Sequence, residues 1–241
     1  MTVGIVFVTF LVMFFGLVFS YISVTVPLYF IFNKHEDARA VKLQKKPIPE
    51  GQIRSEIYWS VLSMIQYAFF TTGIIAGWRL GIFDNFYLFP WERGWLYFFV
   101  SLIMLVLVQD VLFYASHRLL HTKRFAKYHA VHHRSKVPTV FSVYSFHPVE
   151  AFLHSVRLPV VLLLFPVSLV AMIISESLIS NVINAYSHLN YEPRFMRRFA
   201  KLHGKTSATS AYHNLHHAKG NGNYGFYLMF WDKLFGTMFP I

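Results

Sequence analysis

The sequence predicts an all-α protein in which multi-pass transmembrane helices carry a cytoplasmic cap of further helices. The composition is the first reason, since 55% of the residues are hydrophobic and only 14% are charged, against about 25% charged residues in a soluble domain. Four long apolar blocks are the second reason. The third is that histidines gather in clusters next to those blocks, which places polar chemistry at the ends of membrane helices.

The apolar blocks cover residues 3–32, 57–78, 95–116 and 151–187. The first has no charged leader and no clear small-residue cleavage site, so we expect a retained transmembrane helix rather than a signal peptide. The fourth is too long for one ordinary span. Because Pro159 and Pro166 interrupt it, a tight helical hairpin or two broken helices are expected there.

The basic residues give the orientation. Residues 33–54 carry six lysines and arginines, the segment after the third block carries six, and the tail carries seven, whereas the loop between the second and third blocks has only Arg79 and Arg93. The positive-inside rule therefore places 33–54, 117–150 and 189–241 in the cytoplasm and the N-terminus outside. This topology also brings all histidine clusters to one side.

Composition excludes several classes of function. The chain has no cysteine, which rules out disulfides, zinc ribbons, iron–sulfur clusters and thiolate-bound haem within it. The net charge of +11 is better matched to anionic lipid headgroups than to nucleic acid, because the background is so apolar.

Three histidine clusters follow the patterns HRLLH, HAVHH and HNLHH, and each spacing is expected to place its imidazoles on one helix face. Their members are His117 and His121, then His129, His132 and His133, then His213, His216 and His217. Neutral imidazole binds iron, zinc, copper and nickel. Eight such ligands exceed the needs of one ion, so the cap is predicted to hold a histidine-rich dimetal site.

The absence of two common motifs limits the classes of metal site that the chain can form. Carboxylate di-iron bundles use Glu-x-x-His pairs, which are absent here, and the chain has only 11 acidic residues. A membrane zinc hydrolase would be expected to show H-E-x-x-H, which is also absent. Asp110 lies on one stripe with Tyr114, His117 and His121. It either accepts the spare N–H of a ligand histidine or is a buried carboxylate bonded to a neighbouring helix.

The clusters resemble the histidine boxes of the fatty acid hydroxylase/sterol desaturase superfamily. Two further stretches are similar to that family, SFHPVE at 145–150 and GNYGFYLMFWDKLFGT at 222–237. The resemblance covers residues 95–241. It implies a membrane oxidoreductase with two iron ions, for which zinc can substitute in purified protein. Such an enzyme hydroxylates or desaturates a lipid, such as a sterol, sphingoid base, fatty acyl chain or carotenoid, using O2 and electrons from a separate donor protein.

The resemblance also assigns residues by position. It makes the eight clustered histidines metal ligands and adds His188, from NAYSHLN, as a ninth. Some relatives have a further histidine where this chain has Asn184, which leaves open whether Asn184 or His203 completes the shell. The side chains expected to orient the ligands are those of Asp110, His147, Glu150 and Asn184. Trp231 and Phe235 are expected to form a structural anchor at the membrane interface.

These patterns predict two regions. Residues 1–94 form an N-terminal transmembrane region with two spans and a basic cytoplasmic loop, and residues 95–241 form the catalytic domain. A chain with no fused donor module favours a bacterial inner membrane over the endoplasmic reticulum. The alternative function is a histidine-rich membrane protein that binds or transports metals, but a transporter should place its ionisable residues near the bilayer midplane.

Overall fold

The computed structural model describes residues 2–33, 40–82, 84–202 and 207–239, so His35 and His203 lie outside the described residues. Four helices within these ranges are long and apolar enough to cross a membrane: Val3–Phe32, Gln52–Arg79, Trp95–Leu120 and Leu169–Ser187. They match the four apolar blocks, which confirms the all-α fold with several membrane helices.

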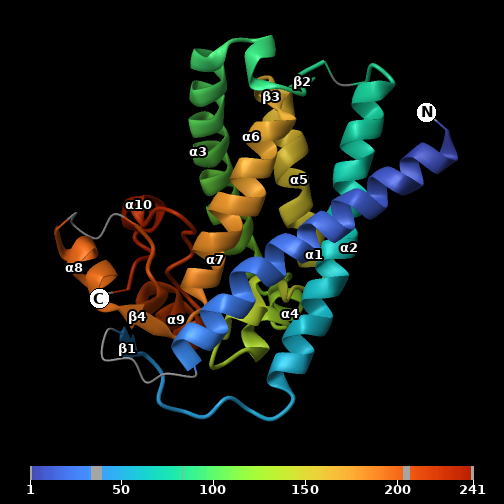
Figure 1. The fold of residues 1–241 in the computed structure, drawn as a ribbon. Helices are drawn as coiled ribbons and strands as arrows, with labels where there is room; N and C mark the ends of the chain where they lie inside the picture. The colour runs from blue at the N-terminus through green and yellow to red at the C-terminus, as the bar shows by residue number, and fades with distance from the viewer. Residues whose placement is uncertain (1, 34–39, 83, 203–206, 240–241) are drawn as a thin grey trace.

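The first three membrane helices are α1 (Val3–Asn33), α2 (Gln52–Arg79) and α3 (Trp95–Leu120). In Figure 1, α1 crosses α2 obliquely, while α3 stands on the other side of the bundle. Large apolar side chains such as Phe15, Phe69 and Leu96 point outward and are 62%, 69% and 80% exposed. Such surfaces suit contact with lipid tails, because lipid does not penalise exposed apolar groups as water does.

The fourth apolar block runs into the bundle and returns. Its elements are α5 (Pro148–Leu164), β3 (Val167–Ser168), α6 (Leu169–Ile173), the π-helix η4 (Ile174–Ser180) and α7 (Asn181–Ser187). The hairpin turns at Pro166, where β3 pairs with β2 (Phe86–Tyr87) beside η1 (Pro90–Glu92). The expected break at Pro159 is wrong, since α5 continues through it. Packing against α2 and α3 holds the helix together despite the missing N–H.

The remaining short elements form a cap at the opposite end of the bundle (Figure 1). They are β1 (Ala40–Lys42), α4 (Ala126–His129), η2 (His132–Arg134), η3 (Val140–Tyr144), β4 (Tyr191–Pro193), α8 (Arg194–Leu202), α9 (Ser210–Lys219) and α10 (Phe230–Leu234). Strand β1 pairs antiparallel with β4 and ties the first basic loop to the cap. All three histidine clusters lie at this end.

Side chains from the membrane helices hold the irregular segment 137–147 in place. The Tyr21 hydroxyl and the Ser60 hydroxyl both donate to the carbonyl of Phe141, at 2.8 and 3.0 Å. Asn184 donates to the carbonyl of Val143 at 2.8 Å. Backbone outside regular structure is tolerated beside a membrane only when its polar groups are satisfied in this way.

The N-terminal helices share a core with the rest of the chain. Tyr21 of α1 and Met64 of α2 pack with Val143 and Ala185 in one buried cluster. The division at residues 94 and 95 therefore stays a prediction about function, while in packing the two regions are continuous.

Candidate metal centre

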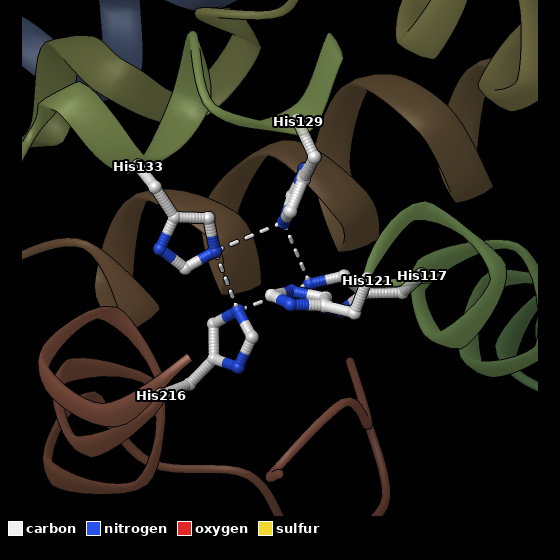
Figure 2. Close-up of side chains that lie close together, drawn as sticks. All are labelled: His117, His121, His129, His133 and His216. Atoms are coloured by element: carbon white, nitrogen blue, oxygen red, sulfur yellow. Dashed lines mark hydrogen bonds between the residues drawn. The ribbon is translucent and has the colours of Figure 1, made fainter. Parts of the chain in front are cut away.

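Five histidines converge on one point in the cap (Figure 2). We call them the first group: His117, His121, His129, His133 and His216. The Nε2 atoms of all but His121 form a closed ring in which neighbours lie 3.2, 3.0, 3.0 and 3.1 Å apart. The Nε2 atom of His121 is buried and has no hydrogen-bond partner among the described residues.

Four more histidines form a second group: His132, His188, His213 and His217. The Nε2 atom of His188 lies 3.2 Å from that of His132 and 2.9 Å from that of His213. The Nε2 atom of His217 follows at 3.0 Å from that of His213. All four side chains of the second group are buried, whereas His121 and His133 of the first group are half-buried.

Hydrogen bonds on the other ring nitrogen fix which atom faces the centre of each group. The Nδ1 atoms of His117, His216 and His188 lie 2.9, 2.7 and 2.9 Å from the carbonyls of Tyr224, Gly222 and Asn184. A carbonyl only accepts, so Nδ1 carries the proton and Nε2 carries a lone pair. In the first group the lone pairs of His117 and His216 therefore face each other, and in the second group His188 points a lone pair at its neighbours. A cation between them would turn that repulsion into attraction.

Burial keeps these imidazoles neutral. Desolvation lowers the pKa of His121 and of His129 to about 3, and it lowers the pKa of His188 to about 4. The imidazole of His129 lowers the pKa of His121 further, because a second charge nearby is unfavourable. Neutral imidazole is the form that binds metals, so the ligands are already deprotonated at neutral pH.

The first group has the size of a metal-binding site. Four atoms joined in a ring by edges of about 3.1 Å lie about 1.9–2.2 Å from their common centre, whether the ring is flat or folded into a tetrahedron. The usual metal–imidazole bond is about 2.0–2.1 Å. An all-nitrogen set of this kind fits iron, zinc, copper or nickel, so the residues present fit the metal that the sequence predicted.

Two of the three histidine clusters are divided between the groups. In HAVHH, His129 and His133 join the first group and His132 joins the second. In HNLHH, His216 joins the first group, whereas His213 and His217 join the second. The expectation that HAVHH lies on one helix face is wrong, because α4 ends at His129 and a 3-10 turn begins at His132. This break in the helix lets His129 and His132 point towards different groups.

Comparison with known proteins identifies the family. The family model for fatty acid hydroxylase matches residues 102–237, which include all nine grouped histidines. The chain belongs to the fatty acid hydroxylase family. This confirms the superfamily predicted from the histidine boxes, and with it an oxidoreductase that acts on lipids.

Relatives within this family extend over most of the chain. Lathosterol oxidase of Mus musculus is 28% identical over 219 residues, which cover 88% of this chain and 68% of the relative. Delta(7)-sterol 5(6)-desaturase ERG3A of Gibberella zeae is 27% identical over 239 residues, which cover 92% of this chain and 60% of the relative. No solved structure gives a significant match.

Among the four side chains expected to orient ligands, the structure places that of Glu150 against a metal group, 2.7 Å from Nδ1 of His129. Asn184 holds Nδ1 of His188 only through its backbone carbonyl, since its side chain donates to the carbonyl of Val143. Asp110 instead accepts from the backbone N–H of Tyr227 and from the indole of Trp231, at 2.8 and 2.9 Å. The alternative interpretation of Asp110, a buried carboxylate bonded to a neighbouring element, is the one that the structure shows.

His147 is also apart from both groups. Its Nδ1 accepts from the backbone N–H of Val149 at 3.1 Å and caps α5. His154 lies outside the predicted set of site residues, yet it is buried next to the site. Its Nε2 lies 3.7 Å from the Glu150 carboxylate. The sequence feature that points to His154 is its spacing of four residues from Glu150, which places both side chains on one face of α5.

Sequence reasoning missed the carbonyls of Gly222 and Tyr224, which hold His216 and His117. The tail segment that presents them is organised by the buried carboxylate of Asp232. It accepts from the backbone N–H groups of Tyr224 and Gly225 at 2.9 and 2.7 Å. Gly225 leaves no space for a side chain, since an added Cβ would lie 2.4 Å from the carbonyl of Leu228. The shape of this turn, held by Asp232 and permitted by Gly225, presents the two carbonyls to the histidines.

Lowering the pH should destabilise the metal-free protein. In the unfolded chain the histidines take up protons below their ordinary pKa of 6.5, whereas in the folded protein His121 and His188 do so only near pH 3 and 4. Between these values the unfolded state binds more protons. Stability is therefore present above pH 6.5 and falls as the pH drops, by about 1.4 kcal/mol per pH unit for each histidine.

Melting temperatures of the metal-free protein in detergent, measured from pH 7.5 to pH 5, test this expectation. His188→Gln removes one titrating group and should make the dependence on pH less steep. A melting temperature that stays constant or rises towards pH 5 would contradict the assignment of buried, neutral imidazoles.

Proposed function

We propose that this protein is a membrane di-iron oxygenase that introduces a hydroxyl group or a double bond into a lipid. The observation that carries the proposal is the pair of histidine groups in the cap, whose Nε2 atoms converge and, in the first group, include unprotonated atoms that face one another. The family supplies the class of reaction. The alternative of a metal transporter has no support, since the family consists of enzymes and the histidines lie at one end of the bundle.

We propose that two neighbouring cavities, which share several lining residues, form one substrate cavity between the metal centre and the membrane helices. Its larger part, about 110 Å³, is lined by residues of α1, α2, α3, α5, η4 and α7. A smaller part of about 20 Å³ reaches His117, His132 and His188. Phe113 and Phe146 are among the residues that line both parts. An apolar molecule in this cavity would present its C–H bonds to the metal centre while water is kept away.

The chemistry suits such a substrate because lipid C–H bonds have no leaving group. Two iron ions held by the histidines would supply an O2-derived oxidant strong enough to remove hydrogen. Hydroxylation uses one O2, two electrons and two protons and releases one water. Desaturation uses the same reactants and releases two waters. The protein's own residues hold the substrate, keep the imidazoles oriented and exclude water.

The two electrons must come from a reduced donor, for which we propose a separate protein. Lys123, Arg124 and Lys127 are exposed, and in the chain they lie between the metal ligands His121 and His129. These cations form a basic surface next to the first group. An acidic donor would be attracted to it by complementary charge, close to the ions that it must reduce.

We propose a sterol as the first substrate to test and desaturation as the first reaction. The support is that the mouse and fungal relatives are named as an oxidase of lathosterol and a desaturase of Delta(7)-sterols. Sphingoid bases, fatty acyl chains and carotenoids are the other candidates within the class.

We further propose that residues 1–94 anchor the protein, that residues 95–241 carry the reaction, and that the cap faces the cytoplasm. The match to residues 102–237 supports the second region, and the basic segments support the orientation. The relatives named above are eukaryotic, so they give no support to the expectation of a bacterial inner membrane.

Product analysis tests the function. Purified protein is loaded with iron, placed in lipid nanodiscs with candidate lipids, and supplied with O2 and a chemical reductant. Mass spectrometry should detect a product that is heavier by one oxygen or lighter by two hydrogens. His132→Ala/His216→Ala should abolish the product, and His147→Gln, which lies apart from both groups, should retain it. Iron-loaded, reduced protein that oxidises none of the candidate lipids would contradict the proposal.

A further inference from the structure

The larger part of the cavity is lined by polar side chains that the metal centre does not use. Three helices lead to it from the cap. On α3 the path runs from His117 through Phe113 to Gln109, and on α5 it runs from Glu150 through His154 to Arg157. On α7 and η4 it runs from His188 through Asn184 and Ser180 to Glu176. All of these side chains line one or both parts of the cavity. Gln109, Arg157 and Glu176, which we call the polar end, line its larger part.

Within the polar end, Gln109 is a buried amide whose nitrogen lacks a hydrogen-bond partner in the described part of the chain. Its side chain is 1% exposed, and its Nε2 has no hydrogen-bond partner among the described residues. A buried amide without a partner costs about 1–3 kcal/mol. Because Gln109 lies in a helix that crosses the membrane, no bulk water offsets this cost. Gln109 lines the larger part of the cavity, so a polar group bound there is a candidate for the missing partner.

Arg157 and Glu176 bring opposite charges to the same space. Within the described residues no ion pair joins them, although both line the cavity. Arg157 is held by a hydrogen bond from its Nε to the carbonyl of His154 at 3.2 Å, and its guanidinium lies 5.3 Å from the ring centre of Phe113. Glu176 lies on the π-helix η4. Ionisable residues at membrane depth and π-helical turns both mark functional positions.

We propose that Gln109, Arg157 and Glu176 form a recognition site for the hydroxyl group of an apolar alcohol, which is the substrate of the function proposed above and on which this inference rests. A hydroxyl accepts from Gln109 or Arg157 and donates to Glu176. A carboxylate would be repelled by Glu176, and an amine by Arg157. A plain hydrocarbon would leave all three unsatisfied.

The site also sets the direction of the substrate. Gln109 and His117 are eight residues apart on α3, which corresponds to about 12 Å along the helix. The wall between them is aromatic, with Phe113, Phe146 and Phe226 lining both parts of the cavity. The hydroxyl therefore points away from the metal centre, and the hydrocarbon part lies over the ions. This arrangement selects which carbons are oxidised.

Binding measurements without turnover test the site. Iron-loaded protein in nanodiscs, with no electron donor, is titrated with two tritiated pairs: cholest-7-en-3β-ol with cholest-7-ene, and octadecan-1-ol with octadecane. At least one alcohol should bind at least about tenfold more tightly than its hydrocarbon partner. Gln109→Leu and Glu176→Met should reduce this preference to below about threefold and leave the hydrocarbon's affinity unchanged.

Thr72→Val is the matched control. The Thr72 hydroxyl is also buried without a partner, but Thr72 does not line the cavity, so this variant should keep the preference for the alcohol. Equal affinity of alcohol and hydrocarbon in both pairs, or an unchanged preference in Gln109→Leu, would overturn the inference. Product analysis is read separately. A protein that oxidises lipids without preferring alcohols would contradict this inference and leave the proposed function intact. A protein that prefers alcohols but oxidises no lipid would contradict the proposed function and leave this inference intact.

Discussion

Removing two ligands of one histidine group should remove one metal ion and leave the other. His133→Ala/His216→Ala deletes two adjacent corners of the Nε2 ring of the first group, and His188→Ala/His213→Ala leaves only two ligands in the second. Each double variant should fall from about two bound ions per chain to about one, because the groups have separate ligands. Lipid oxidation should fall more than about 100-fold in both.

Elemental analysis of iron-loaded, detergent-purified protein measures this result, with product formation measured on the same samples. His147→Ala is the matched control, since its imidazole caps α5 and contacts neither group. It should keep about two ions. If either double variant loses both ions, or keeps both, the division of the nine histidines into two separate sites is wrong.

Asp232→Ala should cause the largest loss of stability of any single change in the tail. The fully buried carboxylate accepts from the N–H groups of Tyr224 and Gly225 and from the hydroxyls of Tyr212 and Thr237. Each buried donor left without a partner costs about 1–3 kcal/mol. The loss of all four hydrogen bonds should reduce the free energy of unfolding by more than about 4 kcal/mol, which should lower the melting temperature by roughly 10 °C.

The same variant should weaken the first group selectively. The carbonyl of Tyr224 holds Nδ1 of His117 at 2.9 Å, and the backbone around Tyr224 is anchored by Asp232. Loss of this orienting contact should lower metal affinity at the first group about 10- to 100-fold, while His188 of the second group keeps its contact with the carbonyl of Asn184. Melting curves and metal content are the two measurements.

The control for this prediction is Asp84→Ala. Asp84 is exposed and precedes β2 at the opposite end of the bundle, so both the melting temperature and the metal content should stay unchanged. An Asp232→Ala protein with normal stability, or one that loses metal equally from both groups, would contradict the role given to this carboxylate.

Local patterns explain what could be predicted about this protein from its residues. Apolar runs long enough to cross a bilayer are a property of consecutive residues, and all four blocks correspond to membrane helices. Histidines three and four residues apart lie on one helix face by helix geometry alone. Glu150 could be proposed as a partner of the metal centre because the stretch SFHPVE resembles a segment of the family. The sequence by itself thus determined the fold class, the family and which histidines are candidate ligands.

Only the tertiary structure decided how these ligands are combined. His117 and His216 are 99 residues apart in the chain, yet their Nε2 atoms lie 3.1 Å apart. Spacing within a cluster carries no information about which distant helix will pack against it, so it did not show that two clusters divide between two sites. The carbonyls of Gly222 and Tyr224 orient two ligands, but every residue has a backbone carbonyl, and residue identity therefore gives no signal. Asp110 could satisfy its buried charge with either of two partners, and the packing of the tail against α3 selected Tyr227 and Trp231.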